Sequence, residues 1–270
     1  MHVFSFLDSI TDSRHMPQSF EQGQAAAKMA DLLAAAEQCG DPVRSAVTAL
    51  LADQRAERLL AAVFSHSPFL SRLILRAPDF LCTFMQQGAS QTMARINEAL
   101  LMLAQAGLPE SELARLLRVR RGQAALCIAL ADISGVWDLQ TVTQALSEFA
   151  RNVLRCTVQA LLRLHAKAGD LRLTAPQSPE LHCGYAIIAM GKLGAGELNY
   201  SSDIDLIILF DPERSGYCGK REQLDFQVRF TKSLVRLLHD FTEDGYVFRV
   251  DLRLRPDPAA TPIVLAVEVA

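Results

Sequence analysis

The chain has 270 residues, of which 50% are hydrophobic, and its formal net charge is −3 with a pI near 6.1. This length allows a sizeable core and one or two domains, whereas the weakly acidic balance argues against a nucleic-acid partner, because phosphate-backbone binding needs a basic surface. No window of about 20 residues is apolar enough to span a bilayer, and the N-terminus has no signal-peptide pattern. We therefore expect a cytoplasmic protein with no membrane partner.

Apolar residues recur with helical spacing through the first part of the chain. The pair Asp41-Pro42 is typical of a helix start. We predict an all-helical domain over residues 1–168, with helices at about 19–38, 41–60, 69–75, 90–105, 110–132 and 139–165. A basic cluster in the fifth of these helices is predicted to be a solvated face: Arg118, Arg120 and Arg121.

The next segment, 169–180, contains two prolines and a glycine and is predicted to be a linker. A second domain is expected over residues 181–270, so the fold class is α+β. Its predicted elements are strands at 185–190, 204–210 and 246–255 and a helix at 221–242. The sequence ends directly after a short apolar run, and we expect this domain to be C-terminally incomplete.

Two aspartates open the predicted strand 204–210. Asp203 and Asp205 are two residues apart, so on a strand their carboxylates project to the same side. The glycine-rich turn Gly-Lys-Leu-Gly-Ala-Gly precedes them and begins at Gly191. Paired carboxylates bind divalent cations, and glycine loops cradle phosphates. This combination indicates metal-assisted chemistry on a nucleotide.

A third carboxylate lies on the predicted strand 246–255, whose residues alternate between apolar and charged. Asp251 falls on the charged side together with three arginines: Arg249, Arg253 and Arg255. Arginine suits phosphate because its planar donor fork engages two oxygens at once. One strand face therefore offers a further metal ligand beside anion-binding cations.

At these motifs the sequence resembles a known family. GKLGAGELNYSSDIDLIILFD followed by FRVDLRLRP resembles the bifunctional glutamine synthetase adenylyltransferase/adenylyl-removing enzymes, members of the DNA polymerase β-like nucleotidyltransferase superfamily. Those chains are several times longer and carry two catalytic domains. The motif sequences here are similar to those of the first, adenylyl-removing domain, since the second domain has sequences closer to WELGYGSDLDL and EVDARLRP. The upstream SHSPFLSRLILRAPDFL is also similar to the helical lead of the first half.

The resemblance implies a helical domain followed by a polymerase β-like mixed sheet with helices. It implies phosphorolysis of an adenylyl-tyrosine on glutamine synthetase, which releases ADP, and, in the full family enzyme, adenylylation from ATP. Mg²⁺ is expected as the cofactor, held by Asp203, Asp205 and Asp251. The residues expected to position phosphates are Gly191, Lys192, Gly194, Ser202 and Arg253.

Three other functions remain open. The chain could run the opposite reaction, adenylyl transfer to a protein tyrosine, because the superfamily chemistry is the same. It could be an inactive truncated fragment that binds glutamine synthetase or a PII-type signalling protein. A small-molecule nucleotidyltransferase is the third, against which the helical lead counts.

Overall fold

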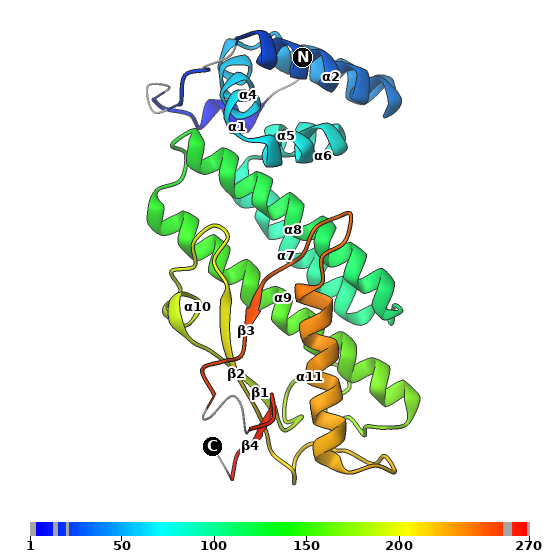
Figure 1. Cartoon of the computed structure of the whole chain (residues 1–270). Helices are drawn as coiled ribbons and strands as arrows, with labels where there is room; N and C mark the ends of the chain where they lie inside the picture. The colour runs from blue at the N-terminus through cyan, green and yellow to red at the C-terminus, as the bar shows by residue number, and fades with distance from the viewer. Residues whose placement is uncertain (1–3, 13–15, 20–21, 256–260, 269–270) are drawn as a thin grey trace. The chain divides into compact units, whose positions relative to one another are not determined.

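The computed structural model describes residues 4–12, 16–19, 22–255 and 261–268 (Figure 1). Its helices, in chain order, are α1 (Ser5–Asp8), α2 (Gln22–Gln38), α3 (Asp41–Leu51), α4 (Gln54–His66), α5 (Pro68–Arg76), α6 (Pro78–Gln87), α7 (Ala89–Gln105), α8 (Glu110–Ile133), α9 (Leu139–Ala168), α10 (Gly191–Ala195) and α11 (Gln223–His239). The strands are β1 (Tyr185–Ala189), β2 (Ile204–Phe210), β3 (Val250–Asp251) and β4 (Leu265–Ala266). The predicted α+β class is confirmed.

Internal contacts group the chain into two compact units. The first comprises Met1–Ile96 and Gly122–Val142, and the second comprises Asn97–Arg121 and Thr143–Ala270. The second unit contains the sheet and also most of α9, from Thr143 onward. The predicted division into a domain at 1–168, a linker at 169–180 and a domain at 181–270 stays a prediction.

The first unit is built from helices whose starts follow local sequence signals. The side chain of Asp53 accepts a hydrogen bond from the Arg55 backbone N–H at 2.8 Å, and Ser67 Oγ accepts one from Leu70 N–H at 3.2 Å. These side chains satisfy backbone donors that a helix leaves unpaired at its first turn. The prediction of one helix at 41–60 is wrong, because the cap at Asp53 starts a new helix, α4.

The sheet of the second unit is mixed. Strand β1 is antiparallel to β2, whereas β3 and β4 are parallel to β2 and pair with different stretches of it. Helix α11 makes the crossover from β2 to β3, as parallel neighbours require (Figure 1). One face of β2 is buried, at Ile204, Leu206, Ile208 and Phe210. The alternate residues, beginning with Asp205, are half-exposed, so the opposite face is available for chemistry.

The predicted strand 246–255 is wrong in its length and in its alternation. Only Val250 and Asp251 pair with β2, and Val247, expected on the charged side, is buried. The backbone N–H groups of Val247 and Phe248 both donate to the carbonyl of Leu238, at 2.9 and 3.0 Å. This stretch is therefore bonded to the end of α11 instead of to the sheet.

The predicted linker 169–180 lies against α9. Arg163 donates to the carbonyls of Pro176 at 2.6 Å and Gln177 at 3.1 Å, and Arg155 donates to Glu180 at 2.8 Å. Proline and polar residues thus indicate an irregular segment here, but one that two helix arginines hold in place.

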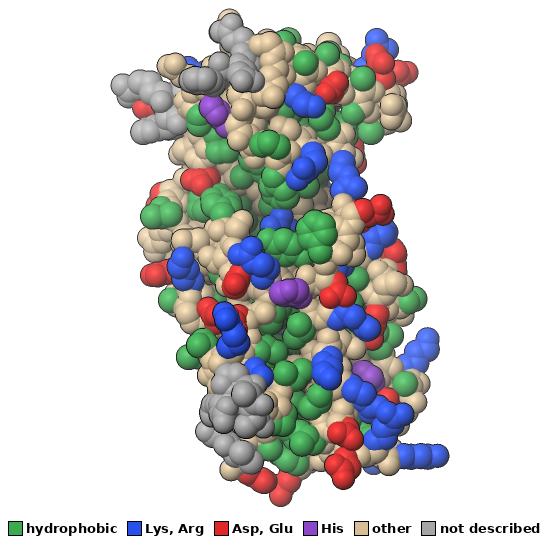
Figure 2. Space-filling model, viewed as in Figure 1, with side chains coloured by type: hydrophobic (Ala, Val, Ile, Leu, Met, Phe, Trp, Pro, Cys, Tyr) green, Lys and Arg blue, Asp and Glu red, His purple; other side chains and the backbone are tan. Residues whose placement is uncertain are grey.

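Acidic and basic side chains are interspersed over the face shown in Figure 2, which agrees with the small net charge of the chain. Within the ranges that the structure describes, no helix has both the length and the apolar character that crossing a membrane would need.

Candidate functional site

Two of the predicted carboxylates are direct neighbours across the sheet. Asp205 on β2 and Asp251 on β3 are register partners in the parallel ladder, one residue beyond the pair of Ile204 and Val250. Side chains of register partners project to the same face, so both carboxylates stand together on the face opposite the buried one. The structure thus brings together two aspartates 46 positions apart (251 − 205), both of which the sequence singled out as candidate metal ligands.

The glycine motif lies against this pair. The predicted turn is a single helical turn, α10, whose first residue Gly191 has a φ of +54°. A Cβ on Gly191 would lie 2.6 Å from Asp205 Oδ2, and the neighbouring Met190 N–H donates to the Asp205 carbonyl at 2.9 Å. Only glycine permits this backbone conformation at such close approach to a carboxylate.

The other predicted phosphate contacts differ in what surrounds them. A Cβ on Gly194 would lie 2.5 Å from the carbonyl of Ala189, so packing of α10 against β1 already accounts for that glycine. Lys192 is exposed, and Ser202 is half-exposed just before β2. Their phosphate-binding roles stay predictions.

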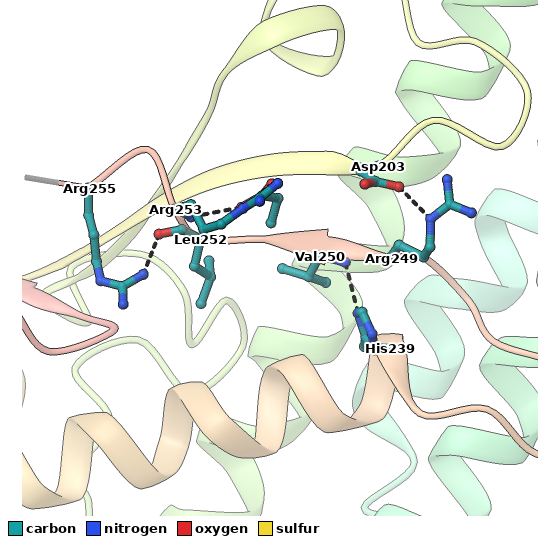
Figure 3. Close-up of polar contacts among 8 residues, drawn as sticks. Asp203, His239, Arg249, Val250, Leu252, Arg253 and Arg255 are labelled. Atoms are coloured by element: carbon teal, nitrogen blue, oxygen red, sulfur yellow. Dashed lines mark hydrogen bonds and ion pairs between the residues drawn. The ribbon is translucent and has the colours of Figure 1, made fainter. Parts of the chain in front are cut away.

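Arginines bond two of the three carboxylates, and the bond to Asp203 is drawn in Figure 3. Asp203 lies one residue before β2, where Arg249 Nε donates to its Oδ1 at 2.5 Å and Arg249 Nη2 donates to the Ser201 carbonyl at 2.6 Å. Asp251 accepts from Arg253 at both oxygens, with Nε to Oδ1 at 3.0 Å and Nη2 to Oδ2 at 2.5 Å. Each of these carboxylates thus has a positive partner supplied from the segment around β3.

Charge pairing shifts the pKa of the groups at Asp251. The hydrogen bond from Arg253 holds the pKa of the Asp251 carboxyl below its usual range, and the same bond raises the pKa of Arg253. The charges of Asp203 and Asp205 raise the pKa of Arg253 further. This arginine therefore lies in the field of all three aspartates.

A dependence of stability on pH follows from the Asp251 pair. Since the pKa of Asp251 is depressed in the folded protein, its contribution to stability is present above the unfolded pKa of about 4 and is lost as the pH falls through the folded value. We expect the free energy of unfolding of Asp251→Asn to fall below that of the wild type at neutral pH, with the difference closing in acid. The difference is small, because Arg253 is 83% exposed.

Urea unfolding from neutral pH down to about pH 2 measures this difference. Asp225→Asn, at an exposed position of α11, makes the same chemical change away from Asp251 and serves as the matched control. A constant gap between Asp251→Asn and the wild type at every pH would contradict the prediction.

The donor set suits a hard cation. Carboxylate oxygens are the ligands that Mg²⁺ prefers, and the bare backbone at Gly191 leaves the approach to Asp205 free of a side chain. In the part of the chain that the structure describes, however, no three acidic, histidine or cysteine side chains are grouped closely enough to hold a metal. Asp203 and Asp251 bond arginines instead, and magnesium binding stays a prediction.

Two residues that sequence reasoning missed hold the backbone around the site. Ser147 Oγ on α9 accepts from the Leu198 N–H at 2.9 Å, which anchors the loop before Asp203. His239 Nδ1, at the end of α11, accepts from the Val250 N–H at 3.2 Å (Figure 3). No motif marks either residue, since each acts on a backbone N–H distant in sequence.

Loss of the Ser147 hydroxyl should destabilise the fold. Ser147 is fully buried and Leu198 is 1% exposed, so Ser147→Ala leaves a buried N–H without its acceptor. We expect a loss of about 1–3 kcal/mol in the free energy of unfolding, measured by urea titration. Ser71→Ala is the control, because that buried hydroxyl donates to the carbonyl of Ser67, the cap residue of its own helix, and it should lose less. Equal losses would refute the anchoring role.

The predicted solvated face at Arg118, Arg120 and Arg121 is wrong for Arg118, which is 4% exposed. Its guanidinium bonds backbone carbonyls around the turn before β3, at Asp240 and Gly245. The basic cluster therefore includes an internal anchor.

Comparison with known proteins agrees with the family resemblance of the sequence motifs. The profile of the family described as Glutamate-ammonia ligase adenylyltransferase matches residues 57–270. The chain is 41% identical over 231 residues to the bifunctional glutamine synthetase adenylyltransferase/adenylyl-removing enzyme of Bradyrhizobium diazoefficiens, covering 85% of this chain and 23% of that protein. It is 41% identical over 249 residues to the enzyme of the same name from Xanthobacter autotrophicus, covering 92% of this chain and 25% of that protein. The chain thus spans about a quarter of the length of these relatives.

Proposed function

Because the chain belongs to the glutamate-ammonia ligase adenylyltransferase family, we propose that it is a nucleotidyltransferase domain that removes AMP from adenylylated glutamine synthetase. The observation that carries the proposal is the register pairing of Asp205 with Asp251, with Gly191 against Asp205. Two adjacent carboxylates on an open sheet face beside a bare backbone are suited to phosphoryl chemistry.

Magnesium is proposed as the cofactor, with Asp203, Asp205 and Asp251 as its ligands. When bound, it would supply positive charge to the phosphate oxygens at which negative charge develops. Asp205 and Asp251, side by side in the ladder, offer the oxygen ligands that this ion prefers, and Asp203 would join them on release from Arg249.

The reaction that we propose is phosphorolysis. An oxygen of inorganic phosphate forms a bond to the phosphorus of the adenylyl group, and the bond from that phosphorus to the tyrosine oxygen breaks. The products are ADP and a tyrosine whose oxygen retains the electron pair and takes up a proton from solvent. Phosphate is already anionic at neutral pH, so Asp251 is proposed as a ligand and not as a general base.

The chain's own residues would bind and orient the two phosphorus centres. Arg253 presents a guanidinium that is 83% exposed and anchored on Asp251, which suits it to hold the incoming anion. Gly191, Lys192, Gly194 and Ser202 are proposed to position the adenylyl phosphate. ATP or ADP, phosphate and glutamine synthetase are the proposed ligands, and a PII-type protein is proposed as a regulator.

The test is release of ADP from adenylylated glutamine synthetase. Purified chain, phosphate and Mg²⁺ are incubated with that substrate, and ADP is measured by chromatography. We expect ADP that depends on both phosphate and Mg²⁺ and that disappears in Asp203→Asn. Asp211→Asn, at the opposite end of β2, is the matched control and should retain activity.

Three results would contradict the proposal in different ways. AMP transfer from ATP to unmodified glutamine synthetase, without ADP release from the adenylylated form, would reverse the direction. Binding of glutamine synthetase without any turnover by a cooperatively melting chain would make it a binding module. ADP that persists in Asp203→Asn would move the chemistry away from this site.

A further inference from the structure

A buried guanidinium on α8 holds the turn that leads into β3. Arg118 is 4% exposed, and its Nε donates to the Gly245 carbonyl at 2.8 Å while its Nη2 donates to the Asp240 carbonyl at 2.5 Å. Its Nη1 donates to the Ala114 carbonyl within α8, also at 2.8 Å. A buried charge requires such bonds, because unpaired it would be strongly unfavourable.

The carbonyls of Asp240 and Gly245 lie at the two ends of one turn. Asp240 directly follows α11, and Gly245 closes a turn in which it exchanges backbone hydrogen bonds with Thr242 at 2.8 and 3.0 Å. Gly245 has a φ of +84°, which permits this tight reversal. The planar guanidinium thus bonds both ends of the turn at once, which a lysine ammonium on a flexible stem does less well.

A second arginine of the same helix holds the next residue. The guanidinium carbon of Arg121 lies 5.5 Å from the centre of the Tyr246 ring. This distance is within the range of a cation–π contact. Burial lowers the pKa of both Arg118 and Arg121. At Arg118 the charges of Asp240 and Asp244 offset part of this effect.

From Tyr246 the backbone is held almost continuously to the site. The N–H groups of Val247 and Phe248 donate to the Leu238 carbonyl, and the N–H of Val250 donates to His239. The Arg249 carbonyl accepts from the Ile204 N–H at 2.9 Å, which begins the pairing with β2. Arg118 therefore holds both ends of the turn from which this bonded stretch leads to Asp251.

We infer that Arg118 and Arg121 are positioning residues for Asp251, which set its register opposite Asp205 by holding residues 240–246 against α8. This inference rests on the proposed function only for its effect on turnover. Neither arginine touches the carboxylates, and both act through the backbone. A loss of either should therefore loosen the β3 segment before it unfolds the chain.

The experiment compares Arg118→Lys with the wild type by hydrogen exchange and by binding of Mn²⁺ alone. We expect amide exchange at residues 247–251 to rise at least about tenfold, with the amides of β1 unchanged. Mn²⁺ affinity should fall in the same variant. Arg115→Lys is the matched control, one turn earlier on α8 and exposed beside Glu112, and should match the wild type in both measurements.

Local exchange decides the inference. Unchanged exchange at residues 247–251 would overturn it, and so would a uniform rise across the chain, which indicates general stability alone. If Arg118→Lys does not fold, Arg121→Lys is judged by the same local exchange. If the wild type releases no ADP while local exchange rises as expected, the proposed function fails and the positioning role stands.

Discussion

Replacing Asp205 by asparagine is expected to lower turnover by at least about a hundredfold, equivalent to ~3 kcal/mol of transition-state stabilisation. Asparagine has nearly the same shape, so it fits beside Gly191. It removes the negative charge that lies next to that of Asp251, the register partner of residue 205 in the ladder. The melting temperature should hold or rise, because two adjacent carboxylates repel each other without a cation.

ADP release and thermal unfolding are measured on the same preparation of Asp205→Asn. Asp211→Asn makes the identical chemical change at the far end of β2 and should leave both quantities near the wild-type values. A large fall in melting temperature for Asp205→Asn would show that the carboxylate stabilises the fold. Retained turnover would remove it from the site.

Gly191→Ala is expected to reduce turnover by about a hundredfold and stability by about 1–3 kcal/mol. The added Cβ would lie 2.6 Å from Asp205 Oδ2, so the carboxylate must move, and the φ of +54° is strained for alanine. Catalysis is sensitive to such a displacement, since misplacement of a reacting group by about 1 Å lowers rates by about a hundredfold.

Gly196→Ala separates strain from collision. Gly196 has a φ of +77°, yet the nearest atom to its added Cβ is Arg151 Nη1 at 4.0 Å. This control should lose stability through backbone strain while keeping turnover. If the two alanine variants lose turnover equally, the contact between Gly191 and Asp205 is not what the reaction requires.

Local pattern predicted much of the second unit. The short apolar run after Asp203 indicated β2, and the spacing and charge of the motif residues identified Asp205 and Asp251, which the structure brings into register. The family resemblance is confirmed by the comparisons. These features depend on nearest neighbours and on strand period, which a single sequence displays directly.

Pairing between distant segments was beyond local pattern. Arg118 reads as a solvated residue among other arginines, yet it bonds a carbonyl 127 residues away (245 − 118). Residues 246–249 have strand-like alternation, but the Leu238 carbonyl takes two of their N–H groups. In both cases tertiary hydrogen bonds override the local preference, as they do for β propensity in general.

The shortness of β3 has a consequence for the order of folding. Only two residue pairs join β3 to β2, and forming them closes a loop of about 46 residues. The chain loses the conformational entropy of that loop before the contacts of these two pairs can stabilise it. Strands β1 and β2 are joined by a much shorter connection and share five residue pairs, so they can associate earlier. We expect the carboxylate pair to assemble late, after α11 has docked, so that on refolding the recovery of catalytic competence lags behind the recovery of helical signal.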